Sequence, residues 1–474
     1  MRIQPFAMSR RNFMIGTAAC VTLLPIGRSL AQSAPLTIRA AKGASVGLLE
    51  NNKARTPVWS YNERVPGPVI RCRRGGVVDV LFENRLDQPS SIHWHGLRLD
   101  NAMDGVPGLT QDAVEPGSSF HYRFTAPDAG TFWYHPHIYS SEQVDRGLYG
   151  ILVVEEDDAP AVDQDLLMVL DDWRLKDDGA VVEDFGNPHD AAHAGRYGNT
   201  ATLNSEPYLK LDVAQNQRLR LRLCSTANAR ISAISIDDHE LLVAAVDGQP
   251  VVPFAPEDNR ILLSPGQRMD VIVDAGLPSG TTAKIRLITQ SEKLEIGELR
   301  YGDAPARAAP LPPFLPLQPN IEPVSLNLGQ ARNVDVLMQG GAMGQLPDRL
   351  AAGMSHDHGH AETAPASGPL IAWALNGTAG MPDAPLFAAR RNEQVIIAYR
   401  NETLWPHAMH LHGHHVREVS ENGVISDIWR DTVLVDANET RRVAIVCDNP
   451  GKWMLHCHML EHQASGMMSW FTVS

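Results

Sequence analysis

The chain has 474 residues, of which 43% are hydrophobic and 20% are charged, and its formal net charge at pH 7 is -14. This length exceeds what one hydrophobic core usually supports, so we expect several domains, and the composition is that of a globular protein rather than a disordered or membrane protein. The acidic balance argues against a nucleic-acid partner, because phosphate binding needs clustered Lys and Arg.

Residues 1–34 have the features of an export signal. Ser9-Arg10-Arg11-Asn12-Phe13-Met14 is a twin-arginine pattern, and an apolar run from Ile15 to Ile26 follows it. The run is short of the roughly 20 residues that span a bilayer, and its alternative interpretation is a buried helix. We therefore predict export by the twin-arginine machinery and a periplasmic mature protein without a membrane span.

Beyond residue 34 the chain consists of short alternating runs separated by Pro and Gly, without a long helical period. This pattern predicts an all-β protein of sandwiches or barrels. One sequence unit also occurs three times, which indicates three similar domains. We place them at residues 35–156, 157–303 and 324–474, with a Pro-rich linker at 304–323.

Each copy of the unit has two recognisable halves. In the first half, an apolar run leads to His93-Trp94-His95-Gly96 in the first copy and to His410-Leu411-His412-Gly413 in the third. The second half ends at His135-Pro136-His137 and at His456-Cys457-His458. The middle copy has matching runs at 216–223 and 264–273 but no paired histidines. Metal chemistry is therefore expected in the first and third domains, with the second as a spacer.

Four cysteines follow the signal. Cys72, Cys224 and Cys447 lie in apolar, strand-like runs and are predicted to be buried free thiols. A disulfide between Cys72 and Cys224 is the alternative. Cys457 differs from these three because it lies between two histidines.

Four His-x-His pairs form the central constellation of the sequence. Successive side chains of a strand point to opposite faces, so both histidines of a pair face the same way. Eight imidazoles at one location suit a copper cluster better than a single ion. The pairs are His93 with His95, His135 with His137, His410 with His412, and His456 with His458.

The same alternation turns Cys457 away from its two histidine neighbours and into its own domain. His407 and His462 can meet it there, with Met467 as a distant thioether. Two His, one Cys and a weak axial Met form the ligand set of a blue-copper electron-transfer site. The backbone at Cys457 would then join this site directly to the cluster.

In order and spacing these motifs resemble those of the multicopper oxidases, the family of laccases, bilirubin oxidases and bacterial copper-resistance oxidases. The resemblance covers essentially the whole mature chain. It implies three cupredoxin-like Greek-key β-sandwich or barrel domains, four copper ions, dioxygen as electron acceptor and a small reducing substrate.

Carried over by motif, the resemblance also implies which residues bind each copper ion. His93 and His410 would hold a lone cluster copper. One copper of a coupled pair would be bound by His95, His135 and His458, and the other by His137, His412 and His456. The blue copper would be bound by His407, Cys457 and His462, with Met467 axial and Met468 the neighbouring alternative.

Making water consumes protons, so carboxylates near the motifs matter. Asp104 matches the family position that hydrogen-bonds water at the lone copper, and we predict that it delivers protons. Several bacterial relatives carry Glu directly after the last histidine ligand, where this chain has Gln463. An amide cannot supply a proton, and nearby Glu461 is expected to be structural.

The resemblance favours laccase-like oxidation of phenols or aromatic amines. Met338, Met343, Met354 and residues 356–360 add thioether and imidazole donors, which leaves oxidation of Cu(I) or Mn(II) as an alternative. A plain solvated loop is the other interpretation of that segment. A non-catalytic periplasmic protein on the same scaffold is the third alternative, but it would have lost ligands that this chain keeps.

The remaining histidines lack such context. We expect structural or solvated roles for His121, His189, His193 and His239, and contacts to the ligands or surface positions for His414 and His415.

Overall fold

The computed structural model describes residues 34–49, 54–320, 325–346, 350 and 370–474. The predicted signal, apart from its last residue, and the donor-rich segment 354–360 lie outside these residues. Residues 36–474 form one compact unit, to which the following description applies. Among the described residues, no helix combines the length and the hydrophobicity needed to cross a membrane.

Within the described part of the chain, the strands form six sheets that belong to three successive portions of the sequence. The sheets of the first portion are β2(Thr56–Tyr61)-β1(Leu36–Val46)-β4(Val77–Asn84)-β6(Ser119–Thr125) and β3(Ile70–Arg73)-β8(Gly150–Glu155)-β7(Gly130–His135)-β5(His93–His95). Those of the second are β10(Thr200–Leu203)-β9(Gln164–Trp173)-β12(Arg218–Ser225)-β17(Arg268–Asp274)-β14(Leu242–Val246)-β15(Gln249–Phe254) and β11(Leu209–Val213)-β19(Lys293–Tyr301)-β18(Thr282–Ile288)-β13(Ser232–Ile236)-β16(Ile261–Leu263).

The third portion repeats this arrangement. Its sheets are β21(Trp373–Leu375)-β20(Arg332–Gly340)-β23(Glu393–Asn401)-β28(Thr440–Cys447)-β25(Val416–Val419)-β26(Ile425–Arg430) and β22(Ala388–Ala389)-β30(Met468–Val473)-β29(Gly451–Cys457)-β24(His407–Leu411)-β27(Thr432–Val435). The short helices are α1(Ser140–Asp145), α2(Pro188–Ala192) and α4(Leu460–Ala464), with 3-10 turns η2(Asn101–Met103) and η3(Glu257–Asn259).

The strand pairing repeats with the sequence unit. The first strand of each portion pairs in parallel with a later one, as β1 with β4, β9 with β12 and β20 with β23. A second parallel pair also recurs, as β3 with β8, β11 with β19 and β22 with β30. The predicted all-β architecture of three cupredoxin-like units is confirmed.

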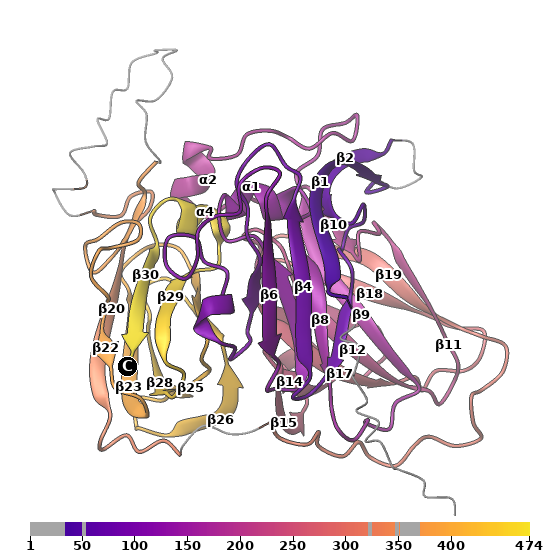
Figure 1. Cartoon of the computed structure of the whole chain (residues 1–474). Coiled ribbons are helices and arrows are strands. Elements are labelled where there is room, and N and C mark those ends of the chain that lie inside the picture. The colour runs from indigo at the N-terminus through magenta and orange to yellow at the C-terminus, as the bar shows by residue number, and fades with distance from the viewer. Residues whose placement is uncertain (1–33, 50–53, 321–324, 347–349, 351–369) are drawn as a thin grey trace, which may run out of the picture. The chain divides into compact units, whose positions relative to one another are not determined.

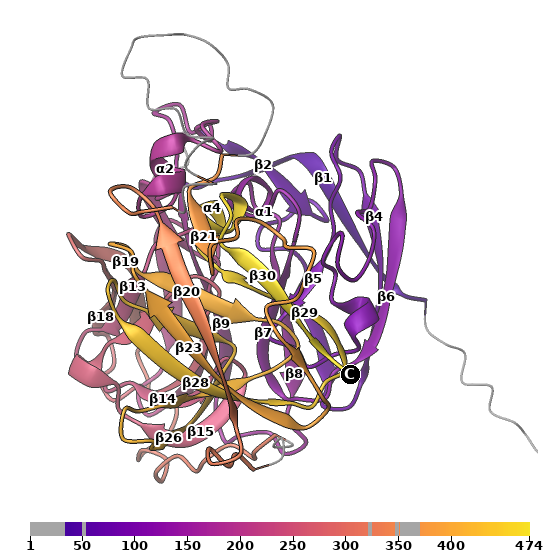
Figure 2. The same cartoon turned by 90° about the vertical axis from the view of Figure 1, so that its left-hand side faces the viewer.

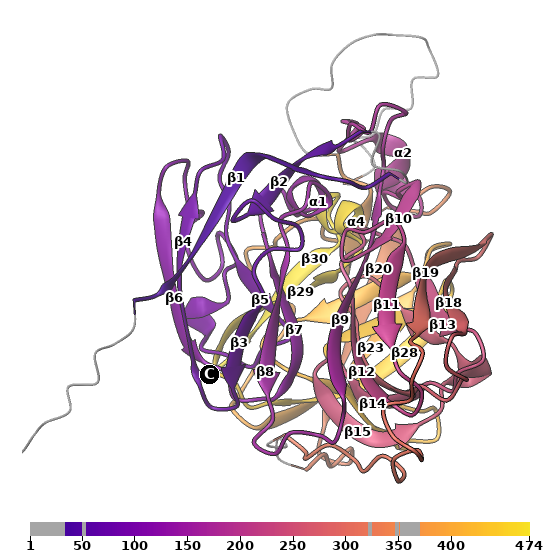
Figure 3. The same ribbon diagram turned by 90° about the vertical axis from the view of Figure 1, so that its right-hand side faces the viewer.

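Burial explains why these runs form sandwich strands. Along β4, buried and less buried residues alternate, so Val78, Val80 and Phe82 point into the core. In β12 the leucines enter the core of the middle portion, whereas Arg220 and Arg222 are also buried and pair with carboxylates. The face of this sheet that carries the arginines contacts β7 of the first portion, and Figure 3 shows β9 and β12 beside β7.

The apolar cores bring the first and third portions together. Their buried side chains form one contiguous cluster, which includes Trp94 from β5 and Cys457 from β29, whereas the middle portion has a core of its own. Helices α1 and α2 both contact α4 beside the upper ends of β29 and β30 (Figures 1 and 2). Histidine motifs that lie more than 300 residues apart in the sequence therefore meet, as His137 and His456 do.

The cysteines behave as predicted from their apolar surroundings. Cys72, Cys224, Cys447 and Cys457 are all free thiols, so the alternative disulfide between Cys72 and Cys224 is not formed. Cys72 is partly exposed, and the other three are buried.

Candidate metal centres

Two pairs of neighbouring strands present the eight paired histidines. In the first portion β5 lies against β7 with His93 opposite His135, and in the third β24 lies against β29 with His410 opposite His456. The second members His137, His412 and His458 follow directly where these strands end. All eight side chains are buried, and His137 is the most exposed at 7%.

The structure brings the predicted trios together. His95, His135 and His458 have ring nitrogens within 4.8 Å of one another, and so do His137, His412 and His456. A third group joins His93 and His410, the pair predicted for the lone copper, with His95. Rings of the first and third portions stack directly, with centroids 3.7 Å apart for His95 and His410.

The hydrogen bonds of several of these rings leave one nitrogen free to bind a metal, whereas His456 Nε2 lies 3.3 Å from His137 Nε2 and 3.2 Å from His412 Nε2. His93 Nδ1 donates to the Asp104 carbonyl at 2.8 Å, and His410 Nδ1 donates to the Asp431 carbonyl at 2.9 Å. A neutral imidazole that donates through one nitrogen has a lone pair on the other. Buried nitrogens without a partner among the described residues are His93 Nε2, His95 Nδ1, His135 Nε2, His410 Nε2 and both ring nitrogens of His458. Convergent, unpaired lone pairs are what a bound metal cluster would satisfy.

Burial also keeps these rings in the form that binds metal. Desolvation lowers the pKa of seven of these rings, and repulsion from neighbouring histidines lowers it further, because the charged imidazolium is disfavoured. The pKa is lowered for His410 and lies well below its usual range for His95, His135, His137, His412, His456 and His458. These seven rings are therefore neutral imidazoles at pH 7.

A second centre lies on the other side of β29. Cys457 Sγ is 3.6 Å from His407 Nδ1 and 3.7 Å from His462 Nδ1, and the two Nδ1 atoms are 3.1 Å apart. None of the three side chains is exposed. Burial raises the pKa of the Cys457 thiol to about 12 and lowers that of His462 to about 4. The Cys457 side chain thus points toward His407 and His462, while His456 and His458 point toward the histidine cluster, as the alternation of side chains along a strand predicted.

Both histidines of this trio are held through their outer nitrogen. His407 Nε2 donates to Thr403 Oγ1 at 2.9 Å, and His462 Nε2 donates to the His193 carbonyl at 2.8 Å. Met467 is fully buried, and its carbonyl accepts the backbone N–H of Cys457 at 3.0 Å. Met468 is less buried and is the register partner of His456 in the sheet.

The chain segment around α2 covers the outer side of His462. Trp373 packs against the His462 ring with centroids 4.4 Å apart, and its Nε1 donates to the Ala191 carbonyl at 2.6 Å. The ring of His193 lies edge-on to Trp405 at 5.3 Å. His462 has no exposed surface, and this segment lies on its outer side.

The carboxylate and amide positions near the motifs differ in what they contact. Asp104 is buried, and its Oδ2 accepts from His412 Nδ1 at 2.9 Å. Gln463 Oε1 accepts from Ser140 Oγ at 3.2 Å, and Glu461 Oε1 accepts from Ser141 Oγ at 2.6 Å. Asp104 is therefore the carboxylate among them that touches the cluster histidines.

The other histidines occupy varied positions. His121 pairs with Asp79, His239 with the Tyr301 hydroxyl, and His189 stacks on His193. His414 donates to the carbonyl of the ligand candidate His412, and His415 Nε2 lies 3.7 Å from Asp431 Oδ2. Sequence analysis expected a structural or solvated role for His193 and did not predict that its carbonyl accepts a hydrogen bond from His462.

Sequence reasoning also missed three residues that hold the candidate ligands, namely Thr403, Arg268 and Asp431. Thr403 and Asp431 each lie a few residues from a histidine motif or its partner strand, but their side chains have no distinctive spacing. Arg268 lies in the middle copy, three residues after Pro265 of the ligand-free repeat. Its strand also carries Asp270 and Asp274, so the charge of Arg268 does not single it out in the sequence.

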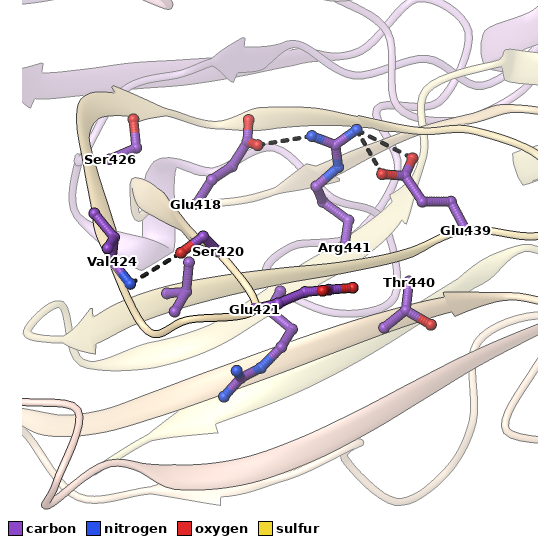
Figure 4. A pocket seen from close by; sticks show the side chains of 10 residues that line it. Glu418, Ser420, Glu421, Val424, Ser426, Glu439, Thr440 and Arg441 are labelled. Atoms are coloured by element: carbon purple, nitrogen blue, oxygen red, sulfur yellow. Dashed lines mark hydrogen bonds and ion pairs between the residues drawn. The ribbon is translucent and has the colours of Figure 1, made fainter.

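A polar hollow of about 440 Å³ lies outside both centres, between the turn joining β25 to β26 and the start of β28 (Figure 4). Arg441 pairs there with Glu418 at 2.9 Å and with Glu439 at 2.8 Å. These carboxylates are already neutralised, and no residue lining the hollow is a ligand candidate.

Comparisons with known proteins agree with this geometry. Models of one family, described as multicopper oxidase, match residues 45–159, 164–286 and 346–474. The structure of a multi-copper oxidase from Pseudomonas thermotolerans is 30% identical, with a TM-score of 0.79 and coverage of 93% of this chain and 99% of that chain. Multicopper oxidase MmcO of Mycobacterium tuberculosis is 29% identical over 436 residues, 86% of this chain and 81% of that protein. Laccase-1 of Fomitopsis schrenkii is 29% identical over 442 residues, 85% of this chain and 80% of that protein.

Proposed function

This chain belongs to the multicopper oxidase family, and from that premise we propose that its electron donors are phenols or aromatic amines. It is a copper-dependent oxidoreductase with dioxygen as electron acceptor. The observation that carries the proposal is that Cys457 lies in one donor group while its chain neighbours His456 and His458 lie in two others. The backbone therefore offers a short covalent route for electrons between the two centres.

We assign the ligands as the motifs predict, and the free nitrogens described above support this assignment. When bound, copper supplies one-electron oxidation at the blue site and reduction of dioxygen at the cluster. His407, Cys457 and His462 would hold the blue copper, with Met467 as a further sulfur ligand, and full burial of Met467 favours it over Met468. His93 and His410 would hold the lone copper, and the two remaining histidine trios would hold the coupled pair.

Asp104 is the residue to which we assign proton handling. Its Oδ2 accepts a hydrogen bond from His412, and its carbonyl accepts one from His93, so the carboxyl group lies at the junction of two predicted copper sites. Reduction of dioxygen to water consumes protons, which an acid–base group must deliver. Gln463 cannot serve as an acid, and the Asp431 carboxylate, which also contacts a cluster ligand, is bound through both oxygens by Arg268. We therefore assign proton delivery to Asp104.

The surface over the blue site supports aromatic donors. Trp405 is partly buried and contacts His193, whose carbonyl binds His462, so a planar ring stacked there lies close to the copper ligand. Mn(II) prefers oxygen ligands. Among the described residues, the groups of ligand side chains that could hold a metal ion are confined to the two centres. Of the donors that motivate the metal-ion alternative, Met338 is buried in the core and Met343 is exposed, whereas Met354 and residues 356–360 lie outside the described residues.

Oxygen uptake by the copper-loaded protein tests the proposal. With a dimethoxyphenol as donor, we expect four phenols to be oxidised for each dioxygen consumed, without release of hydrogen peroxide. Replacing Trp405 by Leu should raise KM for the phenol about 3- to 10-fold, the scale of a lost aromatic contact. Trp429→Leu, on β26, is the control and should leave KM unchanged. Faster uptake with Cu(I) or Mn(II) than with the phenol would favour the metal-ion alternative, and no uptake at full copper loading would favour a non-catalytic protein.

We further propose that the domains divide as the repeat predicts, and that residues 1–34 direct twin-arginine export to the periplasm. The paired residues Arg10 and Arg11 carry the export proposal. Changing both to Lys should retain the protein in the cytoplasm, as cell fractionation and activity staining would reveal. Periplasmic recovery of that variant would contradict the assignment.

A further inference from the structure

A buried ion pair joins the ligand-free middle portion to the cluster. Arg268 lies at the start of β17, and Asp431 lies between β26 and β27 of the third portion. The guanidinium donates to both carboxylate oxygens, from Nη1 at 2.8 Å and from Nη2 at 2.6 Å. Neither side chain is exposed.

The carboxylate of this pair contacts two predicted copper ligands. His95 Nε2 donates to Asp431 Oδ1 at 3.2 Å, and His410 Nδ1 donates to the Asp431 carbonyl at 2.9 Å. These bonds leave His95 Nδ1 and His410 Nε2 without partners among the described residues. The residue therefore selects which nitrogen of each ring is available to the metal.

Arg268 is itself held rigidly. Its Nε donates to the Thr131 carbonyl at 3.2 Å, and its Nη1 donates to the Gly266 carbonyl at 3.1 Å. Asp247 accepts the backbone N–H groups of Arg268, Asp431 and Thr432 at 3.1, 3.1 and 3.3 Å, which ties the two chain segments together.

The glycines beside the pair show how close its packing is. A Cβ at Gly96, directly after His95, would lie 2.1 Å from Arg268 Nη2. A Cβ at Gly266 would lie 2.9 Å from the His458 ring and 3.0 Å from the His95 ring. Both positions have positive φ and no room for a side chain, so the middle portion directly contacts the cluster histidines.

The pairing favours an ionised acceptor. Arg268 donates two parallel hydrogen bonds to the Asp431 oxygens, the fork geometry in which a guanidinium binds a carboxylate. An ionised carboxylate can only accept hydrogen bonds, so it holds His95 with its Nε2 as the donor.

We propose that Arg268 and Asp431 are positioning residues for the copper cluster: Arg268 fixes the Asp431 carboxylate, which sets the orientation and tautomer of His95, while the adjoining carbonyl sets those of His410. The middle domain, which supplies no ligand, thereby completes the cluster. This inference rests on the proposed copper ligands, and its test separates the two.

The principal variants are Asp431→Asn, which keeps size but not charge, and Arg268→Leu. The matched control is Arg220→Leu in the neighbouring strand β12. Arg220 is equally buried and pairs with Asp270 at 2.5 Å and Glu156 at 2.6 Å, and neither partner is a proposed copper ligand. Copper per chain, the blue absorption band, the EPR signal of the non-blue copper and the midpoint of unfolding are measured for each.

We expect both principal variants to keep the blue band while non-blue copper binds about 10- to 100-fold more weakly and its EPR parameters change. Arg220→Leu should lose stability but retain all copper. Arg268 also lies 3.5 Å from Asp247, so Arg268→Leu leaves two buried carboxylates without their cation. The double variant Arg268→Leu with Asp431→Asn removes one of these charges, so it should regain part of the stability lost in Arg268→Leu without regaining the non-blue copper.

Parallel recovery of stability and copper in the double variant would overturn the inference, because the pair would then act through folding alone. Equal copper loss in Arg220→Leu, or unchanged non-blue copper in Asp431→Asn, would overturn it as well. If Arg268→Leu does not fold, Asp431→Asn still decides the question. A wild-type protein that binds no blue or cluster copper would instead refute the proposed ligands.

Discussion

Replacing Thr403 by Val should weaken the blue site without touching a copper ligand. The Thr403 hydroxyl accepts the His407 Nε2–H at 2.9 Å and the Trp405 backbone N–H at 3.2 Å, and it donates to Asn401 Oδ1 at 2.7 Å. Thr403 and His407 have no exposed surface, so water cannot substitute for the hydroxyl. Valine has nearly the same shape but leaves two buried N–H groups without an acceptor.

The size of the effect follows from these two groups. Each buried donor left unpaired costs about 1–3 kcal/mol, so the folded state should lose about 2–6 kcal/mol in total. Asn401 Oδ1 keeps the backbone N–H of Thr403 at 3.0 Å and adds little to this loss. Because His407 is also freed to rotate, copper affinity at the blue site should fall about 10- to 100-fold.

Two measurements check this prediction. Denaturant unfolding of the metal-free protein gives the stability loss, and the blue band in chelator-buffered copper gives the affinity. Thr403→Ser keeps the hydroxyl and is the control, which should remain within about 1 kcal/mol of the wild type. Wild-type affinity and stability in Thr403→Val would refute the reasoning, since they would mean that the His407 hydrogen bond contributes nothing.

Further predictions concern the ligands and the proton route. Cys457→Ser should abolish the blue band and substrate oxidation while the cluster copper stays bound, and persistence of the blue colour would contradict the assignment. Met467→Leu should raise the potential of the blue copper, as redox titration would show, because an axial thioether tunes that potential. Asp104→Asn should retain copper and the blue band but lower turnover about 10²-fold or more; near-normal turnover would point to another acid. Because burial lowers the pKa of His462 to about 4 and raises that of Cys457 to about 12, loading the metal-free blue site should release one proton, from the thiol. Affinity should then fall about tenfold per unit as pH drops from about 8 to 5, and steepening near the ordinary histidine pKa of about 6.5 would contradict this.

The sequence predicted those features that leave a local pattern. Alternating apolar runs gave the all-β class, and strand geometry predicted that Cys457 faces away from His456 and His458. Eight histidines in four short motifs could be placed at one location because both histidines of a His-x-His pair on a strand face the same way. Their division among the copper ions came from the family resemblance. The same reasoning could not give the angle at which the first and third portions meet, since no local residue encodes it.

Other features depend on what a side chain meets across an interface. The run from Arg218 to Leu223 alternates Arg and Leu and would suggest a solvated face, yet Arg220 and Arg222 are buried against carboxylates. Arg268 and Asp431 come from different portions of the chain, so neither predicts the other. Main-chain contacts such as the His193 carbonyl bond to His462 leave no side-chain signature at all.

The hydrogen bond between the His193 carbonyl and His462 joins two portions of the chain that are far apart in the sequence. The proposed ligands of the blue site come from the third portion of the chain, whereas residues 187–193, which include the His193 carbonyl bonded to His462, come from the second. Exchange of this short segment for one of another sequence can alter donor preference while every metal ligand stays in place. Natural selection for a new donor, or protein engineering, could thus change the sequence of residues 187–193 and leave the proposed copper ligands unchanged.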